Sequence, residues 1–187
     1  SGVAARAAVL THELRSAWTD FKCGLVAGIA GRLRAVAQEA RPGVDVILNS
    51  FGLGRPDFGN AVEEVLAQRF SDLDPVIDHY ELMFYFQIQK RDPSTWIPAR
   101  VNEVREQTTR TVLACLQGGA EYLEDVYRPG GRKREITPQD WRDALTAVAT
   151  SQADGVMIYS WRDLLADEAQ GGARVRDLLA YKAGELD

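Results

Sequence analysis

The chain has 187 residues, a mass of 20.7 kDa and 45% hydrophobic residues, which predicts one globular domain over residues 1–187 and argues against disorder. The net charge is −5 and acidic and basic residues are interleaved along the chain, so the basic stripe that nucleic-acid binding requires is missing. We therefore expect no nucleic-acid partner, and we expect no membrane partner because no apolar stretch approaches the length of a membrane span.

The cysteine and histidine content argues against the commonest metal sites and nucleophiles. Cys23 and Cys115 are too few for a disulfide scaffold and lack metal-ligand spacing. His12 and His79 lie far apart, which gives little support to a histidine metal site or a Ser-His-Asp triad. We expect no metal and no cofactor. The amino terminus lacks the apolar core of a signal peptide, and the compartment stays undefined.

The first part of the chain is predicted to contain a long helix, a strand and a short helix. In residues 10–40 large apolar residues recur every three or four positions, which marks one face of a helix. These residues are Leu14, Trp18, Phe21, Leu25, Ile29, Leu33 and Val36. The Arg-Pro-Gly sequence at residues 41–43 ends the helix. Residues 44–50 predict the first strand, with Asn49 at its carboxyl end, and residues 60–70 predict a short amphipathic helix.

Residues 76–87 form the most aromatic segment and predict the second strand. Alternation divides its side chains between two faces, with Glu81, Met83 and Tyr85 on one and Tyr80, Leu82 and Phe84 on the other. A polar interior rim tolerates a carboxylate and a phenol, whereas a face covered by helices does not. We therefore expect the face with Glu81 to point into the interior of a barrel.

A third strand and two helices are predicted in the next part of the chain. Residues 98–109 predict a charged helix, and residues 111–117 predict a strand that Gly118-Gly119 closes. The connection over residues 118–136 is long enough to be functional or mobile. A helix is then predicted from Thr137 to about residue 151. Thr137 is its N-cap, Pro138 is its first helical residue, and Asp140 is its third.

The fourth strand lies in residues 153–163, and a last helix covers residues 172–183. Alternation again gives two faces, with Met157, Tyr159 and Trp161 on one and Val156, Ile158 and Ser160 on the other. Large aromatics at the carboxyl end of a parallel strand suit a sugar-binding barrel mouth, and they are equally good core residues.

Four strands, each followed by a helix, predict an α/β fold with a parallel βα repeat of four strands and about five helices. A (β/α)8 barrel needs eight such units, so the chain corresponds to half of a TIM barrel. A half-barrel leaves two strand edges unpaired, and we expect a homo-oligomer or a missing amino-terminal half-barrel to cover them. The alternative is an open doubly wound sheet, although no Gly-rich nucleotide loop follows any predicted strand.

Two segments resemble strands of glycoside-hydrolase-like barrels, namely chitinase-like family 18 and related uncharacterised barrels. Residues 77–85 are similar to the sixth-strand pattern, and residues 155–161 are similar to the eighth-strand "Gly-Val-Met" run that ends near an aromatic. The resemblance implies strands five to eight of the barrel and a carbohydrate partner. Phe86 replaces an aspartate and Tyr159 replaces the usual Trp. The resemblance also places the acid/base carboxylates upstream of Ser1.

The candidate site residues gather at the predicted carboxyl ends of the strands. Glu81 and Asp163 are the candidate catalytic carboxylates, since glycoside hydrolysis usually needs two. The alternative interpretations are a glutamate in a buried ion pair or hydrogen-bonded in the core, and an aspartate that caps the following turn. The candidate substrate-binding residues are Asn49, Tyr85, Gln87, Gln117, Tyr159 and Trp161. Gln117 ends strand three, where many barrel glycosidases carry a nucleophilic glutamate.

Two main hypotheses follow from these residues. The first is a glycoside-hydrolase-like domain that hydrolyses or binds a poly- or oligosaccharide and is incomplete in this chain. The second is a non-catalytic half-barrel that binds carbohydrate or assembles with a partner, which Gln117 and Phe86 favour. A barrel enzyme acting on phosphorylated metabolites is a third, weaker alternative, because the relevant loop offers acids and no Gly-rich nest.

Overall fold

The computed structural model describes residues 2–186. Contacts divide the described chain into two compact units. Unit 1 contains residues 2–47 and 53–78, and unit 2 contains residues 48–52 and 79–186. The single domain over residues 1–187 stays a prediction, and each unit is described by itself.

Unit 1 is helical. It consists of α1 (Gly2–Ala8), the π-helical turn η1 (Val9–Glu13), α2 (Arg15–Ala40), the 3₁₀ turn η2 (Asp57–Gly59), α3 (Ala61–Glu64) and α4 (Phe70–Leu73). The long helix predicted over residues 10–40 is confirmed in its main part. The continuous helix predicted over residues 60–70 is wrong, because Ala67 has a left-handed backbone with φ of 56° that interrupts it.

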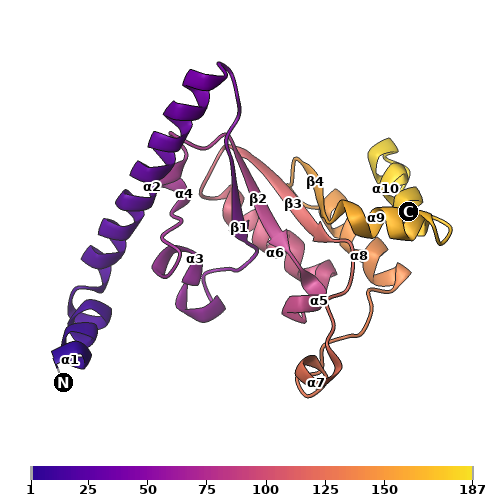
Figure 1. The fold of residues 1–187 in the computed structure, drawn as a ribbon, viewed down its shortest axis with the longest axis horizontal. Helices are drawn as coiled ribbons and strands as arrows, with labels where there is room; N and C mark the ends of the chain where they lie inside the picture. Colours follow the sequence, from indigo (N-terminus) through magenta and orange to yellow (C-terminus); the bar gives the residue numbers. More distant parts are fainter. Residues whose placement is uncertain (1, 187) are drawn as a thin grey trace. The chain divides into compact units, whose positions relative to one another are not determined.

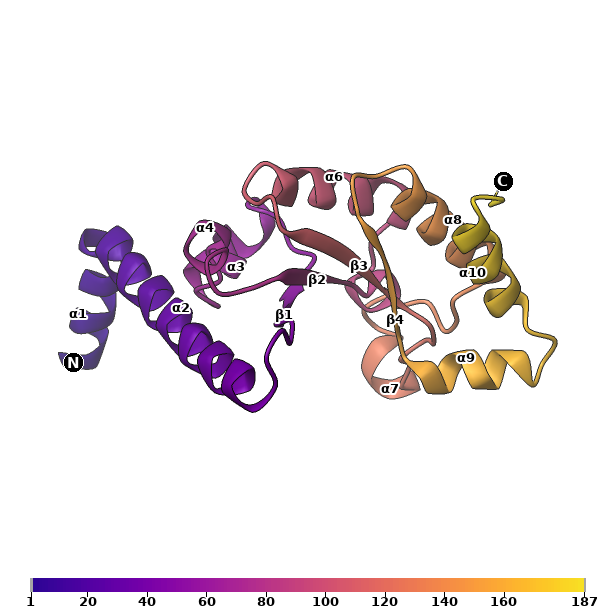
Figure 2. The same ribbon diagram turned by 90° about the horizontal axis from the view of Figure 1, so that it is seen from above.

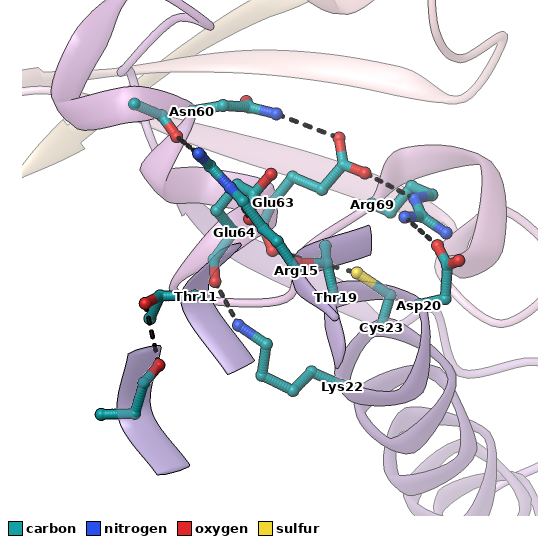
Figure 3. A network of polar contacts seen from close by, with 12 residues as sticks. Thr11, Arg15, Thr19, Asp20, Lys22, Cys23, Asn60, Glu63, Glu64 and Arg69 are labelled. Atoms are coloured by element: carbon teal, nitrogen blue, oxygen red, sulfur yellow. Dashed lines mark hydrogen bonds and ion pairs between the residues drawn. The ribbon is translucent and has the colours of Figure 1, made fainter. Parts of the chain in front are cut away.

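A polar network ties α2 to α3 and α4 (Figure 3). The Arg69 guanidinium donates to the carboxylates of Asp20 and Glu63, each at 2.7 Å. The Thr19 hydroxyl donates to Glu64 Oε2 at 2.9 Å. Burial alone would raise the pKa of Glu64, but hydrogen bonds from Thr19 and a neighbouring arginine hold that pKa below its ordinary value. One side of α2 is therefore fixed by polar contacts.

Unit 2 contains a four-stranded sheet with the strand order β1-β2-β3-β4 (Figure 1). The strands are β1 (Ile47–Phe51), β2 (His79–Phe84), β3 (Thr111–Gln117) and β4 (Gly155–Tyr159). They run parallel, as the registers of β2 with β3 and of β3 with β4 show directly. All four predicted strands are confirmed, and the helical crossovers between them explain the parallel direction.

Ten α-helices lie within residues 2–186, and several of them are a single turn long, whereas the sequence predicts about five. Those of unit 2 are α5 (Phe86–Gln89), α6 (Pro93–Arg105), α7 (Glu124–Tyr127), α8 (Pro138–Ala149), α9 (Trp161–Glu168) and α10 (Ala173–Ala183). The predicted helix over 98–109 begins earlier, because Asp92 caps it and Pro93 occupies its first turn. Thr137 caps α8 as predicted.

One face of the sheet forms the core of unit 2 with the helices. Figure 2 shows α6 and α8 along the same side of the strands. The β2 and β3 side chains on this face are almost fully buried, namely Tyr80, Leu82, Phe84, Val112, Ala114 and Leu116. The rings of Phe84 and Trp96 on α6 meet edge to face at 5.1 Å between centroids. This covered face leaves the opposite face of the sheet for the candidate site.

Candidate functional site

The face opposite the helices carries Glu81, as the sequence predicts. Strand registers align Met83 with Cys115 and Cys115 with Met157, so these side chains share the face of Glu81 by alternation. Met83, Leu113 and Met157 are only partly buried, in contrast to the β2 and β3 residues of the helix-covered face. We call this partly open surface the inner face.

Asn49 also belongs to the inner face. Its neighbour Ser50 is fully buried, and a side chain at Gly52 would collide with the Phe84 ring, so Ser50 and Gly52 share the helix-covered face. Alternation then places Asn49 and Phe51 on the inner face. Asn49 lies in the middle of β1 and is exposed, whereas the sequence placed it at the end of the strand.

Glu81, Cys115 and Tyr85 form a polar group within the inner face. Glu81 is only 8% exposed and Cys115 is 2% exposed. Burial, followed by a hydrogen bond to Glu81 and the charge of that carboxylate, raises the pKa of Cys115 to about 12. The thiol is therefore protonated at neutral pH, which excludes it as a nucleophile because the thiolate is the reactive form.

The phenol of Tyr85 stays neutral for the same reasons. Burial raises the pKa of Tyr85, and the neighbouring Cys115, Glu81 and Tyr159 add to the effect. A neutral phenol can both donate and accept a hydrogen bond. Glu81 and Tyr85 together therefore offer an acceptor and a donor on the inner face, close to the carboxyl ends of the strands.

An aromatic pair lies at the edge of this polar group. The rings of Tyr85 and Tyr159 stack, with 5.4 Å between centroids and an interplanar angle of 29°. Tyr159 is the last residue of β4 and is 56% exposed, so this pair is accessible to a ligand. The structure thus brings together Glu81, Tyr85 and Tyr159 from the predicted set.

Trp161 does not continue the strand. The prediction that it shares a strand face with Met157 and Tyr159 is wrong, because β4 ends at Tyr159 and Trp161 is the first residue of α9. Its side chain is 70% exposed. The peptide bond between Tyr159 and Ser160 is cis. Sequence reasoning missed α9, although the Ser160-x-x-Asp163 spacing is a capping-box signal.

Asp163 caps α9, which was the alternative interpretation of this residue. Its Oδ2 atom accepts hydrogen bonds from the Ser160 amide at 3.0 Å and from the Ser160 hydroxyl at 2.9 Å. The Gly119 backbone packs directly against the same carboxylate, and a β-carbon at Gly119 would lie 2.5 Å from Oδ1. Asp163 therefore caps the start of α9 in close contact with the loop after β3.

Gln87 and Gln117 bind each other and the loop that follows β3. The Gln117 amide donates to Gln87 Oε1 at 3.0 Å and to the Gly119 carbonyl at 2.7 Å. The Gln87 amide donates to the carbonyls of Glu121 and Lys133, at 3.1 and 2.6 Å. Gln87 lies in α5, since β2 ends at Phe84 and not at residue 87. Both glutamines thus anchor the long loop, and their substrate-binding role stays a prediction.

A separate cavity of about 350 Å³ was missed by sequence reasoning. Residues of α5, the amino-terminal ends of α6 and α8, and the long loop line it, including Lys90, Asp92, Lys133 and Asp140. Lys133 pairs with Asp140 at 2.6 Å, and Lys90 donates to the Gly130 carbonyl at 2.9 Å. Gln87 is the one predicted site residue in its lining.

Metal-ligating clusters and membrane-spanning helices are both absent from residues 2–186. That part of the chain contains no cluster of three or more metal-ligating side chains. Among the same residues, every helix is too short or too polar to cross a bilayer.

Comparisons with known proteins bear on the fold. No family model matches the sequence, and no curated protein matches it. The structure is similar to the glycoside hydrolase domain of PgaB (BpsB) from Bordetella bronchiseptica, with a TM-score of 0.67 and 18% sequence identity. The match covers 92% of this chain and 46% of that chain, so this chain spans about half of its neighbour. The chain therefore has a glycoside-hydrolase-like α/β fold, a parallel βα repeat that corresponds to half of a TIM barrel.

Proposed function

We propose that unit 2 binds carbohydrate on its inner face, at the carboxyl ends of β2 and β4. The observation that carries this proposal is the exposed ring of Tyr159, stacked on the partly buried Tyr85 beside the buried carboxylate of Glu81. Flat aromatic rings pack well against the C–H faces of pyranose rings, and they also supply a polar edge. Barrel enzymes carry their sites at this end of the strands.

The polar groups would select hydroxyl-rich ligands. Glu81 would accept hydrogen bonds from sugar hydroxyls, and the neutral phenol of Tyr85 would donate one. Asn49, on the same face, would add a side-chain amide, and Trp161, exposed at the start of α9, would extend the aromatic surface. Gln87 and Gln117 would act by holding the loop beside the site, because their amides are already engaged.

Hydrolysis is the second candidate function, and the buried carboxylate of Glu81 favours it. Glu81 is 8% exposed and lies on the inner face, and it would act as the general acid. Asp163 would then be the second carboxylate, but one of its oxygens already accepts two hydrogen bonds from Ser160. Hydrolysis would therefore need a further carboxylate from a partner chain or from a missing amino-terminal half-barrel.

The fold comparison supports the carbohydrate proposal at the level of fold only. The similar protein is a glycoside hydrolase domain, and this chain corresponds to about half of it. The finer assignment to chitinase-like family 18, with strands five to eight, is part of the proposal. It rests on the motifs of residues 77–85 and 155–161.

Calorimetric titration with a panel of neutral and amino-sugar oligosaccharides tests the proposal. We expect Tyr159→Ala to weaken binding about 10-fold or more, whereas Tyr159→Phe retains most of the affinity because it keeps the ring. Phe58→Ala is the matched control, since Phe58 is an exposed aromatic of unit 1. Affinity that is equal in the wild type and in Tyr159→Ala would rule out this surface as the binding site.

Product release from the same oligosaccharides separates binding from hydrolysis. The proposal predicts binding without turnover by this chain. Turnover that is lost in Glu81→Gln and retained in Asp163→Asn would establish hydrolysis with Glu81 as its acid. Turnover unaffected by either substitution would exclude both carboxylates from the chemistry.

A further inference from the structure

The long helix α2 presents an apolar stripe that the packing of unit 1 leaves largely exposed. The stripe consists of Leu14, the residue that precedes α2, and of Trp18, Phe21, Leu25, Ile29, Leu33 and Val36 within it. Each of these large side chains is between 38% and 65% exposed. Thr19 and Cys23, which are buried, lie on the other side of α2 and contact the rest of unit 1 through the network of Figure 3. Unit 1 therefore does not use the apolar face of its longest helix for its own core.

The stripe is larger than an ordinary exposed patch. From Leu14 to Val36 it extends about 33 Å at the helical rise of 1.5 Å per residue. Its seven side chains expose on the order of 700 Å², above the 300–600 Å² of the largest patch on a typical monomer. A standard specific interface buries about 800 Å² on each partner. The stripe thus has the dimensions of a complete interface.

The order of residues in the stripe makes it complementary to itself. When two copies of α2 run antiparallel with their Leu25 residues opposite each other, Leu14 faces Val36 and Phe21 faces Ile29. Trp18 then faces Arg32, an exposed residue beside the stripe, and an arginine over an indole ring is a favourable cation–π contact. These pairs join large to large or cation to aromatic, and Leu33 alone among the stripe residues faces a small side chain, that of Ala17.

The spacing of the stripe also fits a second straight helix. Its seven residues follow at intervals of four, three, four, four, four and three. The mean interval is about 3.7 residues, slightly above the 3.6 of an α-helix, so the stripe drifts by only about 40° around the helix axis over its whole length. Figure 1 shows α2 as one uninterrupted helix. Exposed Gly24 and Gly28 lie next to the stripe, and a β-carbon at either would meet no atom within 4 Å, which leaves room for close approach.

We infer that α2 is a homodimerisation helix whose stripe binds the stripe of a second copy of this chain in an antiparallel pair centred on Leu25. Two copies related by a twofold axis bury the same surface on each protomer. The inference concerns unit 1 alone and does not depend on carbohydrate binding by unit 2.

The oligomeric state of the full chain tests the interface. Light scattering after size exclusion should show a dimer for the wild type and a monomer for Leu25→Lys, with dimer affinity at least about 100-fold weaker because the substitution is present twice. Ser16→Lys, an exposed position on the other side of α2, should remain dimeric. Circular dichroism should be unchanged in both variants. A wild type that is monomeric at about 100 µM would overturn the inference.

Oxidative cross-linking tests the antiparallel arrangement independently. Leu25→Cys lies on the twofold axis and should form a disulfide-linked dimer, whereas Leu14→Cys alone should not. The double variant Leu14→Cys/Val36→Cys should cross-link, since these residues face each other. The natural Cys23 and Cys115 are both buried. Efficient cross-linking of Leu14→Cys alone would indicate a parallel pair and would contradict the proposed interface.

Discussion

Replacing Gln117 by glutamate should destabilise unit 2 strongly, although it changes a single amide to a carboxylate. Gln117 is 1% exposed. Its Nε2 atom donates to Gln87 Oε1 at 3.0 Å and to the Gly119 carbonyl at 2.7 Å. In Gln117→Glu an ionised oxygen would replace this donor and would face two acceptor oxygens. The substitution therefore removes two hydrogen bonds and adds electrostatic repulsion.

The magnitude follows from these contacts. The lost hydrogen bond to Gln87 costs about 1 kcal/mol, because Gln87 Oε1 still accepts from the Glu121 amide at 3.3 Å, and the Gly119 carbonyl that loses its donor costs about 1–3 kcal/mol. We expect Gln117→Glu to lower the free energy of unfolding by about 3–5 kcal/mol at pH 7. Gln117→Met is the matched control, because it removes the same hydrogen bonds without a charge, and it should cost about 2–3 kcal/mol.

The pH dependence distinguishes the two variants. Burial among acceptors should raise the pKa of the introduced carboxyl group above its unfolded value of about 4.3. Its protonated form is favoured in the folded state, so stability is highest below that unfolded value and falls as the pH rises through the folded pKa. In urea unfolding, the free energy of unfolding of Gln117→Glu should therefore fall further below that of the wild type at pH 7 than at pH 4. The difference between Gln117→Met and the wild type should be the same at both pH values.

If Gln117→Glu had the same free energy of unfolding as the wild type at pH 7, this reasoning would be refuted. It would mean that the amide of Gln117 is not needed to hold Gln87 and the loop after β3. The result also bears on function. If the substitution is as costly as we expect, a single change cannot introduce a glutamate at the end of β3 without disturbing the loop beside the candidate site.

Three further predictions concern a helix cap, a carboxylate and the thiols. Asp163→Asn should lower the free energy of unfolding by about 1 kcal/mol, because the amide oxygen of asparagine is a weaker hydrogen-bond acceptor in the capping box than the carboxylate oxygen. An unchanged urea midpoint would contradict this. Thr19→Val should cost about 1 kcal/mol at pH 7, since Thr19 stabilises ionised Glu64. Because the folded pKa of Glu64 is lowered, the loss of unfolding free energy in Thr19→Val should persist above about pH 4.3 and shrink as the pH falls through the folded pKa. An equal loss at pH 7 and at pH 3 would contradict a role of Thr19 in stabilising ionised Glu64. Burial raises the pKa of both Cys23 and Cys115, so an alkylating reagent at pH 8 should label them only after unfolding, and rapid labelling of the native protein would contradict their burial.

The two faces of the sheet were predictable from residue order. Alternation in residues 76–87 separates Glu81 and Tyr85 from Tyr80, Leu82 and Phe84, and the structure buries the second set to 1% exposure or less while Glu81 is 8% exposed and Tyr85 is partly buried. This succeeds because a strand has a strict period of two and one face must meet the helices. The parallel direction followed similarly from the helical connections.

Other features depend on contacts that a one-dimensional pattern does not contain. The predicted helix over residues 60–70 is interrupted at Ala67. Two residues later, the Arg69 side chain donates hydrogen bonds to the carboxylates of Asp20 and Glu63. Gln87 and Gln117 lie 30 positions apart, so their mutual hydrogen bond arises from strand pairing and loop packing. The spacing of apolar residues in α2 predicted an apolar helix face correctly. The same spacing is found on a helix face buried in a core and on one that binds a partner, so the sequence does not distinguish the two.

The start of α9 was within reach of the sequence. Ser160 and Asp163 have the spacing of a capping box, and this signal outweighs the apolar continuation through Trp161. Taking that signal into account would have ended β4 at Tyr159 and placed Trp161 on a helix. The role of Asp163 as a cap would have followed from the same observation.

A nuclear magnetic resonance titration of isotope-labelled protein with an oligosaccharide that binds would test the central claim most directly. Carbohydrate on the inner face should shift the backbone amide signals of Glu81, Tyr85, Cys115 and Tyr159 and their neighbours, and leave those of α6 and α8 unchanged. Shifts confined to the cavity beside Lys90 and Lys133, or to unit 1, would contradict the account.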